Sequence, residues 1–212
     1  EFEDAGIAAI HIEDQVYPKR ASYHRGLEHV VPLEEFLAKI RYALHARRDP
    51  NFMIIGRTDV GTAVGGSWPE AVRRVKALEE LGVDMVMPMT RTMEEMETFR
   101  KLYPNPKLPL LTTAYFNGPT MTELHNLGFQ AIIYPLATVV ASVGAVLRLY
   151  EGLSENGNIS FDQQQALEVR EEIKAAIDLP YYYQIEDATT ERNAQLKKSG
   201  SLGLEGGLDR GQ

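Results

Sequence analysis

The sequence predicts an α/β fold built on a parallel sheet. Short apolar runs alternate with longer segments of helical periodicity, and glycine or proline residues separate the two kinds of segment. The apolar runs are continuous, as is typical of strands that are covered on both faces. This alternation implies parallel strands joined by helical crossovers. A (β/α) barrel and a doubly wound sheet both fit the pattern.

Five apolar runs are expected to form the strands. The first follows Gly6 and ends in His11, Glu13 and Asp14, and the others cover residues 52–56, 85–87, 110–113 and 131–134. Residues 1–5 are interpreted as the end of a helix that Gly6 terminates. Polar residues follow the first two strands directly. They are therefore expected at the carboxyl edge of the sheet, where α/β proteins bind ligands.

Four helices are expected between these strands. Apolar spacing predicts one over residues 33–44, and Ser67 with Gly82 brackets a second that ends near residue 81. Thr92 and Glu95 form a capping box for a third helix. A short fourth helix leads to Gly128. All four are expected to pack an apolar face on the sheet.

The segment after the last strand is different in character. A helix over residues 137–153 has little polar surface, so it is expected to be buried on several sides, with a second subunit as a reasonable partner. Another helix is predicted over residues 161–177. The glycine-rich residues 197–212 have too little apolar content to fold and are expected to form a disordered tail.

Composition restricts the classes of function. The formal net charge is -8, and no stripe of lysine and arginine suggests a nucleic-acid or anionic-membrane partner. The 212 residues contain no cysteine, which excludes thiol catalysis and thiolate metal sites. No apolar stretch is long enough to span a membrane, and no leader peptide is recognised. A cytoplasmic protein that acts on small molecules is the expectation.

Polar residues at the predicted sheet edge are candidates for chemistry. Glu13 and Asp14 could hold a divalent cation such as Mg²⁺, although a solvated Glu13 beside a backbone-capping Asp14 is about equally expected. Arg57 ends an apolar strand and needs an anion, either Asp59 or a substrate carboxylate. Lys19 could bind a carboxylate or act as a base, but on composition alone a surface role is favoured. A lone strand histidine such as His11 is more often structural.

Several short motifs together resemble one superfamily. The sequence is similar to the isocitrate lyase and phosphoenolpyruvate mutase superfamily, and most similar to its methylisocitrate lyase branch. The resemblance covers about residues 1–191 and rests on motifs at 11–15, 18–20, 55–59, 134–136 and 182–186, which occur in the family's order. It implies a (β/α)8 TIM-type barrel of which this chain supplies the last five βα units, within residues 1–153.

The resemblance also implies an assembly and a domain arrangement. The helix after the last strand is expected to be swapped between subunits of a dimer or tetramer, and residues 154–196 to form a helical extension. Three further βα units are expected before Gly6, which amounts to roughly 90 to 100 residues at the usual barrel size.

The chemistry implied by the resemblance is Mg²⁺-dependent, with Mn²⁺ as an alternative ion. A carbon–carbon lyase would act on a small 2-hydroxy or 2-oxo di- or tricarboxylate through an enolate. Glu13 corresponds to the metal-shell glutamate, Arg57 to the carboxylate-binding arginine, and Lys19 to the loop lysine. The other positions expected to line the substrate site are His11, Thr113 and Tyr115.

The chain departs from the family pattern at positions that determine which reaction the lyases catalyse. The lyases carry a cysteine, thought to protonate the leaving carbanion, in the loop where this chain reads Lys-Arg-Ala-Ser-Tyr at 19–23. Tyr23, His24 or Tyr115 would have to replace it. Met89 stands where the lyases have a glutamate, so the pocket is expected to be less polar. The alternatives are an oxaloacetate-type decarboxylase or hydrolase, a phosphonomutase-like enzyme, and a catalytically inactive assembly subunit.

Overall fold

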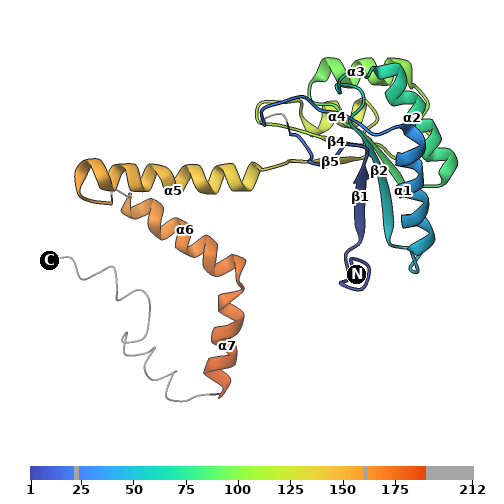
Figure 1. Cartoon of the computed structure of the whole chain (residues 1–212). Helices are drawn as coiled ribbons and strands as arrows, with labels where there is room; N and C mark the ends of the chain where they lie inside the picture. Colours follow the sequence, from blue (N-terminus) through green and yellow to red (C-terminus); the bar gives the residue numbers. More distant parts are fainter. Residues whose placement is uncertain (22–23, 160–161, 190–212) are drawn as a thin grey trace. The chain divides into compact units, whose positions relative to one another are not determined.

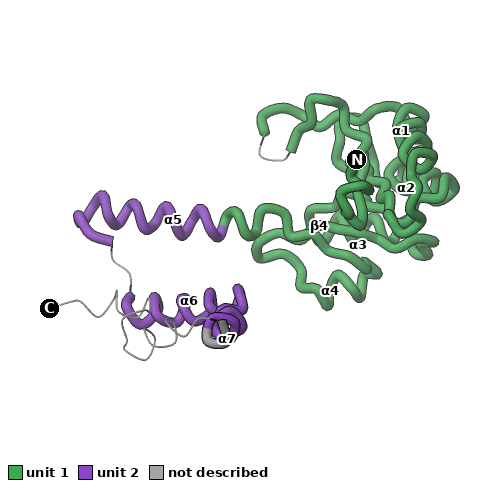
Figure 2. Tube along the Cα trace, turned by 90° about the horizontal axis from the view of Figure 1, so that it is seen from below, with its two compact units in different colours: residues 1–140 green, residues 141–212 purple. Residues whose placement is uncertain are grey.

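The computed structural model describes residues 1–21, 24–159 and 162–189. The chain divides into two compact units, residues 1–140 and residues 141–212, which are coloured separately in Figure 2. The predicted tail at 197–212 and Tyr23 lie outside the described residues. Each unit is described by itself below.

The first unit contains five strands, and every pairing between them is parallel (Figure 1). A single parallel bridge between Val86 and Leu110 connects a three-stranded sheet to a two-stranded one, so neighbours in space are also neighbours in the chain. The predicted α/β class with parallel strands is therefore confirmed. The strands are β1 (Ala9–Glu13), β2 (Met53–Thr58), β3 (Met85–Pro88), β4 (Leu111–Thr113) and β5 (Ala131–Ile133).

Four helices connect these strands, as the periodicity predicts. Ser67 caps the second helix by accepting a hydrogen bond from the Glu70 amide, and Gly82 ends it in the left-handed conformation that glycine adopts without strain. The capping box predicted for the third helix, between Thr92 and Glu95, is present. The helices are α1 (Leu33–Ala46), α2 (Trp68–Leu81), α3 (Met93–Leu102) and α4 (Met121–Asn126).

The two faces of the strands carry different clusters. The main core lies between the helices and the strands and includes fully buried Phe36, Leu78 and Phe99. Gly56 of β2 belongs to this face, because a Cβ there would lie 2.7 Å from Leu78 of α2. A second, smaller cluster of Ile55, Met87, Met89 and Leu111 occupies alternate positions of the same strands. Since successive strand side chains point to opposite faces, this cluster lies on the face away from the helices.

Residues before the first strand form a single turn. The Ala5 amide donates to the Glu1 carbonyl and the Ile7 amide to the Phe2 carbonyl, and Gly6 has φ of 77°. These bonds are those of a helix C-terminus, which is what the sequence predicts for this segment.

The described residues of the second unit are mainly helical. The helices are α5 (Ala137–Asn156), which begins in the first unit, α6 (Gln163–Ala176) and α7 (Leu179–Thr189), and α6 contacts α7. The apolar side chains of α5 are about half exposed within the described chain, for example Val143 and Leu147. The burial expected for this helix is therefore not provided by the described residues of this chain. None of the described helices is both long and apolar enough to cross a bilayer.

Tyr103 joins the second and third helices. It follows α3, and its hydroxyl donates a hydrogen bond to Glu79 of α2, whose carboxylate also accepts the Lys107 amide at 2.9 Å. Burial, followed by the hydrogen bond to Glu79, raises the pKa of the Tyr103 hydroxyl from 10.0 to about 12. The folded state therefore keeps a proton that the unfolded chain releases above pH 10.

The free energy of unfolding should consequently decrease as the pH rises from 10.0 to about 12. In Tyr103→Phe this pH dependence of the free energy of unfolding should be absent. Below this range the variant should be less stable by about 1 kcal/mol, the usual value of one hydrogen bond. Urea unfolding at several alkaline pH values measures both effects. Tyr42→Phe, at a largely exposed site, is the control. An unchanged pH dependence in Tyr103→Phe would contradict the assignment.

Candidate active site

The strand face away from the helices opens into a cavity at the carboxyl ends of the strands. Its volume is about 300 Å³. His11 of β1, Arg57 of β2, Met87 of β3, Thr113 of β4 and Ile133 of β5 all line it. The strand register places Arg57 beside Glu13 on one side and beside Met87 on the other. The cavity therefore lies at the edge where the sequence predicts a ligand site.

Arg57 is buried at the polar end of this cavity. Its Nε and Nη2 donate to the two carboxylate oxygens of Asp59 at 2.8 and 2.9 Å, and Nε lies 3.3 Å from Glu13 Oε2. Burial opposes the charged form, but the hydrogen bonds and charges of Asp59 and Glu13 outweigh it and raise the pKa of Arg57. Asp59 is thus the anion that the strand position of Arg57 requires, and its role is structural, as expected.

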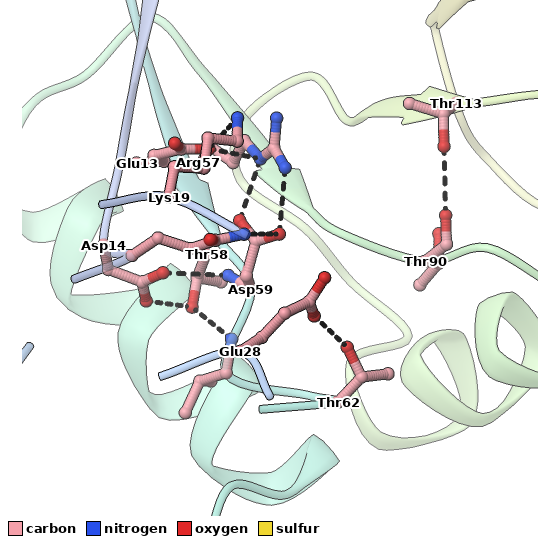
Figure 3. A network of polar contacts seen from close by, with 12 residues as sticks. Glu13, Asp14, Lys19, Glu28, Arg57, Thr58, Asp59, Thr62, Thr90 and Thr113 are labelled. Atoms are coloured by element: carbon pink, nitrogen blue, oxygen red, sulfur yellow. Dashed lines mark hydrogen bonds and ion pairs between the residues drawn. The ribbon is translucent and has the colours of Figure 1, made fainter. Parts of the chain in front are cut away.

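Asp14 holds Asp59 in place. Its Oδ1 accepts the Asp59 amide at 2.9 Å and its Oδ2 accepts the Thr58 hydroxyl at 2.5 Å (Figure 3). Oδ2 also accepts Arg74 Nη1 at 2.9 Å. Gln15 adds a bond to Asp59 at 3.1 Å. Burial raises the pKa of the Asp14 carboxyl, while its three donors favour the carboxylate. Asp14 thus accepts a backbone amide, as considered, but that of Asp59 at the end of the next strand rather than one of its own loop, and it forms a buried ion pair to α2.

Glu13 and Asp14 are neighbours in sequence with opposite surroundings. Asp14 belongs to the helix side, whereas Glu13 Oε2 lies 2.7 Å from Lys19 Nζ and 3.3 Å from Arg57 (Figure 3). In residues 1–21, 24–159 and 162–189 no three aspartate, glutamate or histidine side chains are grouped so as to hold a metal ion. Asp14 and Asp59 are occupied by arginines. Glu13 is likewise paired with Lys19 and Arg57, so the described residues do not by themselves form a metal site, and an ion bound near Glu13 would need further ligands.

The remaining predicted residues lie at different places around the cavity. Lys19, His11, Thr113 and Tyr115 all line it, and Thr113 also donates to the Thr90 carbonyl at 3.2 Å. Burial of the ring, and then the charge of Arg57, lower the pKa of His11. His24 accepts the Ala21 amide at Nδ1 and does not line the cavity that the described residues form.

An ion pair that was not predicted from the sequence lines another side of the cavity. Arg91, after β3, donates to Glu28 at 2.6 Å and to the Thr62 hydroxyl at 2.7 Å. Both charged residues line the cavity, and Glu28 also approaches Thr62 at 3.4 Å (Figure 3). The partners are 63 residues apart, so no local pattern links them. The position of Arg91 directly after a strand was the one available signal.

The fold and this cavity define a parallel α/β protein with a cationic site at the carboxyl ends of its strands. The chain belongs to the phosphoenolpyruvate phosphomutase family, whose model matches residues 1–154. It is 36% identical to a 2-methylisocitrate lyase of Shewanella oneidensis over 162 residues, which cover 74% of this chain and 54% of that protein. The chain spans about half the length of the curated relatives it matches.

Solved structures of the same superfamily share the fold. A phosphoenolpyruvate phosphomutase from Streptomyces platensis subsp. rosaceus superposes with a TM-score of 0.71 at 25% identity, covering 90% of this chain and 66% of its own. A phosphonopyruvate hydrolase solved with oxalate and Mg²⁺ gives 0.64 at 29% identity, covering 85% and 65%. The superfamily resemblance stated from the motifs is therefore confirmed.

The contribution of the buried ion pair of Asp14 and Arg74 to stability can be measured by substituting Arg74 and, as a comparison, the neighbouring Arg73. Arg74→Met should destabilise the fold by about 3 to 5 kcal/mol, because Asp14 would remain buried without its ion-pair partner. Arg73→Met is the matched control. Arg73 also binds Glu70, but its side chain is 60% exposed compared with 6% for Arg74, so about 1 kcal/mol or less is expected. Urea unfolding of both variants gives the comparison, and equal losses would count against the buried pair.

Proposed function

We propose that this chain is part of an enzyme that cleaves a carbon–carbon bond in a small 2-hydroxy or 2-oxo carboxylate through an enolate. The observation that carries the proposal is the buried guanidinium of Arg57, which ends a strand and lines the cavity at the carboxyl edge of the sheet. A guanidinium in such a place binds a carboxylate through two parallel hydrogen bonds. Membership of a family with named lyases, mutases and hydrolases supports it.

The roles of the polar residues follow from their positions. Arg57 already has a fixed orientation because Asp59 holds two of its nitrogen atoms, so binding a carboxylate needs little further ordering. Lys19 lines the cavity and pairs with Glu13 at an exposed site, so its ammonium group can move from Glu13 to a substrate oxygen in the cavity. His11, which burial keeps in the neutral form, can donate or accept one hydrogen bond. Arg57 and Lys19 together place positive charge where an enolate develops.

Mg²⁺, with Mn²⁺ as the alternative, is the cofactor that we propose. The hydrolase solved with oxalate and Mg²⁺ supports this ion. Glu13 is the residue of this chain that would face it, and the remaining ligands would come from outside the described residues. Such an ion would supply positive charge to the enolate oxygen. The three upstream βα units of a (β/α)8 barrel are part of the proposal, as are the swapped α5, a homo-oligomer and a cytoplasmic location.

Tyr115 is the proton donor that we favour. Of the three candidates it lines the cavity, where its hydroxyl can transfer a proton to the carbanion left by bond cleavage. His24 does not itself line the cavity that the described residues form, although its Nδ1 accepts the amide of the lining residue Ala21, and Tyr23 is outside the described residues.

Two other functions have specific support. Ala21 lines the cavity in place of the lyase cysteine, which favours a decarboxylase, hydrolase or phosphonomutase-like reaction that forms the same enolate with a different proton donor. The exposed apolar side of α5 favours a non-catalytic assembly subunit. Sequencing the intact polypeptide separates these classes: an upstream acidic Asp-x-Asp segment supports an enzyme, and its absence supports the assembly subunit.

Arg57→Ala, made in the intact protein, tests whether Arg57 binds the substrate carboxylate. With Mg²⁺ and a panel of 2-hydroxy and 2-oxo acids, kcat/KM should fall about 100-fold, which corresponds to loss of roughly 2.7 kcal/mol of charged hydrogen bonding. Arg57→Lys should raise KM while keeping the charge, because an ammonium cannot bind a carboxylate through two parallel bonds.

Arg48→Ala is the matched control for both variants. Arg48 is an exposed arginine that pairs with Glu3 and Asp4, away from the cavity lining. Urea unfolding separates loss of binding from loss of structure. Unchanged turnover by Arg57→Ala for every accepted acid would show that the role is assigned to the wrong residue.

A further inference from the structure

Arg91 is a second guanidinium in the wall of the cavity, one strand further along the sheet than Arg57. It follows β3, lines the cavity, and has a side chain that is only 20% exposed. Its Nη1 donates to the Thr62 hydroxyl at 2.7 Å and its Nη2 to Glu28 at 2.6 Å. The Glu28 side chain is 12% exposed, so this ion pair is largely removed from water. Residues that follow β1 and β2 thus fix the orientation of Arg91.

These contacts leave part of the Arg91 guanidinium without an acceptor. Nε donates to no residue of the described chain, and Nη2 carries two hydrogens, of which Glu28 takes one. An arginine side chain has five N–H donors, and a carboxylate binds two adjacent ones through parallel hydrogen bonds. Nε and Nη2 are such an adjacent pair. Arg91 can therefore bind a ligand carboxylate while Thr62 and Glu28 hold it in place.

Arg57 and Arg91 lie close enough together to bind one small molecule. Oδ1 of Asp59 accepts a hydrogen bond from Arg57 Nη2 at 2.9 Å and lies 3.9 Å from Arg91 Nη2. The two guanidinium groups thus border the same carboxylate oxygen, and both line the same cavity. A small dicarboxylate can place one carboxylate near each of them.

Cleavage of a 2-hydroxy acid requires a group that accepts the electron pair of the broken bond. When the C2–C3 bond breaks, the hydroxyl proton is released to water and the electrons of its O–H bond complete the C2 carbonyl of a 2-oxo acid. The C2–C3 electron pair moves to C3, where a carbonyl group must be attached to stabilise it. A C4 carboxylate supplies this carbonyl, gains a second negative charge as the enolate forms, and loses it when Tyr115 protonates C3. A cation beside that carboxylate stabilises the transition state more than the bound substrate.

We propose that Arg91 binds the second carboxylate of the substrate, the one that carries the charge of the enolate, while Arg57 binds the first. The substrate class is then a 2-hydroxy or 2-oxo acid with a carboxylate attached to the carbon on which the electrons are left. Arg91 is a catalytic residue and also selects for this second carboxylate. Glu28 orients Arg91 and competes with the ligand for it. This inference rests on the proposed function and adds a residue and a substrate class to it.

Two acids that differ only at C4 test the inference. Malate carries a carboxylate where 2-hydroxybutanoate carries a methyl group. Calorimetric titration of the intact protein in the presence of Mg²⁺ should show at least about tenfold tighter binding of malate, as expected for a hydrogen-bonded charge. In Arg91→Met the affinity for malate should fall by about the same factor, and the affinity for 2-hydroxybutanoate should be unchanged. For any dicarboxylate that is cleaved, kcat should also fall, because the charge on its second carboxylate increases in the transition state.

Glu28→Gln distinguishes binding by Arg91 from a role in holding the loops together. The amide keeps an acceptor for Nη2 but removes the competing charge, so malate should bind more tightly. Arg91→Lys keeps the charge without the two adjacent donors and should recover part of the affinity for malate. Arg73→Met is the matched control, because Arg73 pairs with Glu70 outside the cavity lining, and it should leave both affinities unchanged. Equal weakening of both acids in Arg91→Met and Glu28→Gln would show a structural role alone and overturn the inference.

Arg57→Ala separates failure of this inference from failure of the proposed function. Both acids have the first carboxylate, so Arg57→Ala should weaken the binding of both. Equal affinity of the unaltered protein for the two acids, or binding of neither, overturns the role of Arg91, while turnover of other acids in the panel leaves the proposed function standing. Unchanged binding and turnover in Arg57→Ala overturns the proposed function and the inference with it.

Discussion

The carboxylate of Asp14 is the group on which the organisation of the site depends. It joins three elements, because it accepts hydrogen bonds from the end of β2 and from Arg74 of α2 while lying directly after β1. This arrangement fixes the Asp59 amide and therefore the Asp59 carboxylate. Asp59 in turn fixes Arg57, which approaches Glu13 and so lies next to Lys19. A buried charge that contributes little to stability by itself thus determines the positions of groups that line the cavity.

The parts of the fold that could be predicted from the sequence are those with local signals. Ser67, Gly82 and the capping box of Thr92 and Glu95 define helix ends within one or two residues, because each acts on backbone groups of its own turn. The positions of polar residues after strands likewise predicted the correct edge of the sheet. The alternation of side chains along a strand could also have separated Glu13 from Asp14, since neighbours in a strand face opposite ways.

The parts that could not be predicted depend on pairs distant in sequence. Arg74 is 60 residues from Asp14 and Arg91 is 63 residues from Glu28, and a helix or loop arginine without its partner is typical of a solvated surface. For α5 the difficulty is different. An apolar helix pattern indicates that something covers the helix but not what covers it, and in the described residues its side chains are about half exposed.

The paired charges also explain how a cavity with so many arginines and lysines can exist in a folded chain. An unpaired guanidinium in the position of Arg57 would lose hydration without compensation, so each buried cation needs a carboxylate from the chain itself. The same pairing reduces the net charge that the cavity presents to a ligand. A ligand carboxylate would therefore compete with the chain's own carboxylates for the same cations.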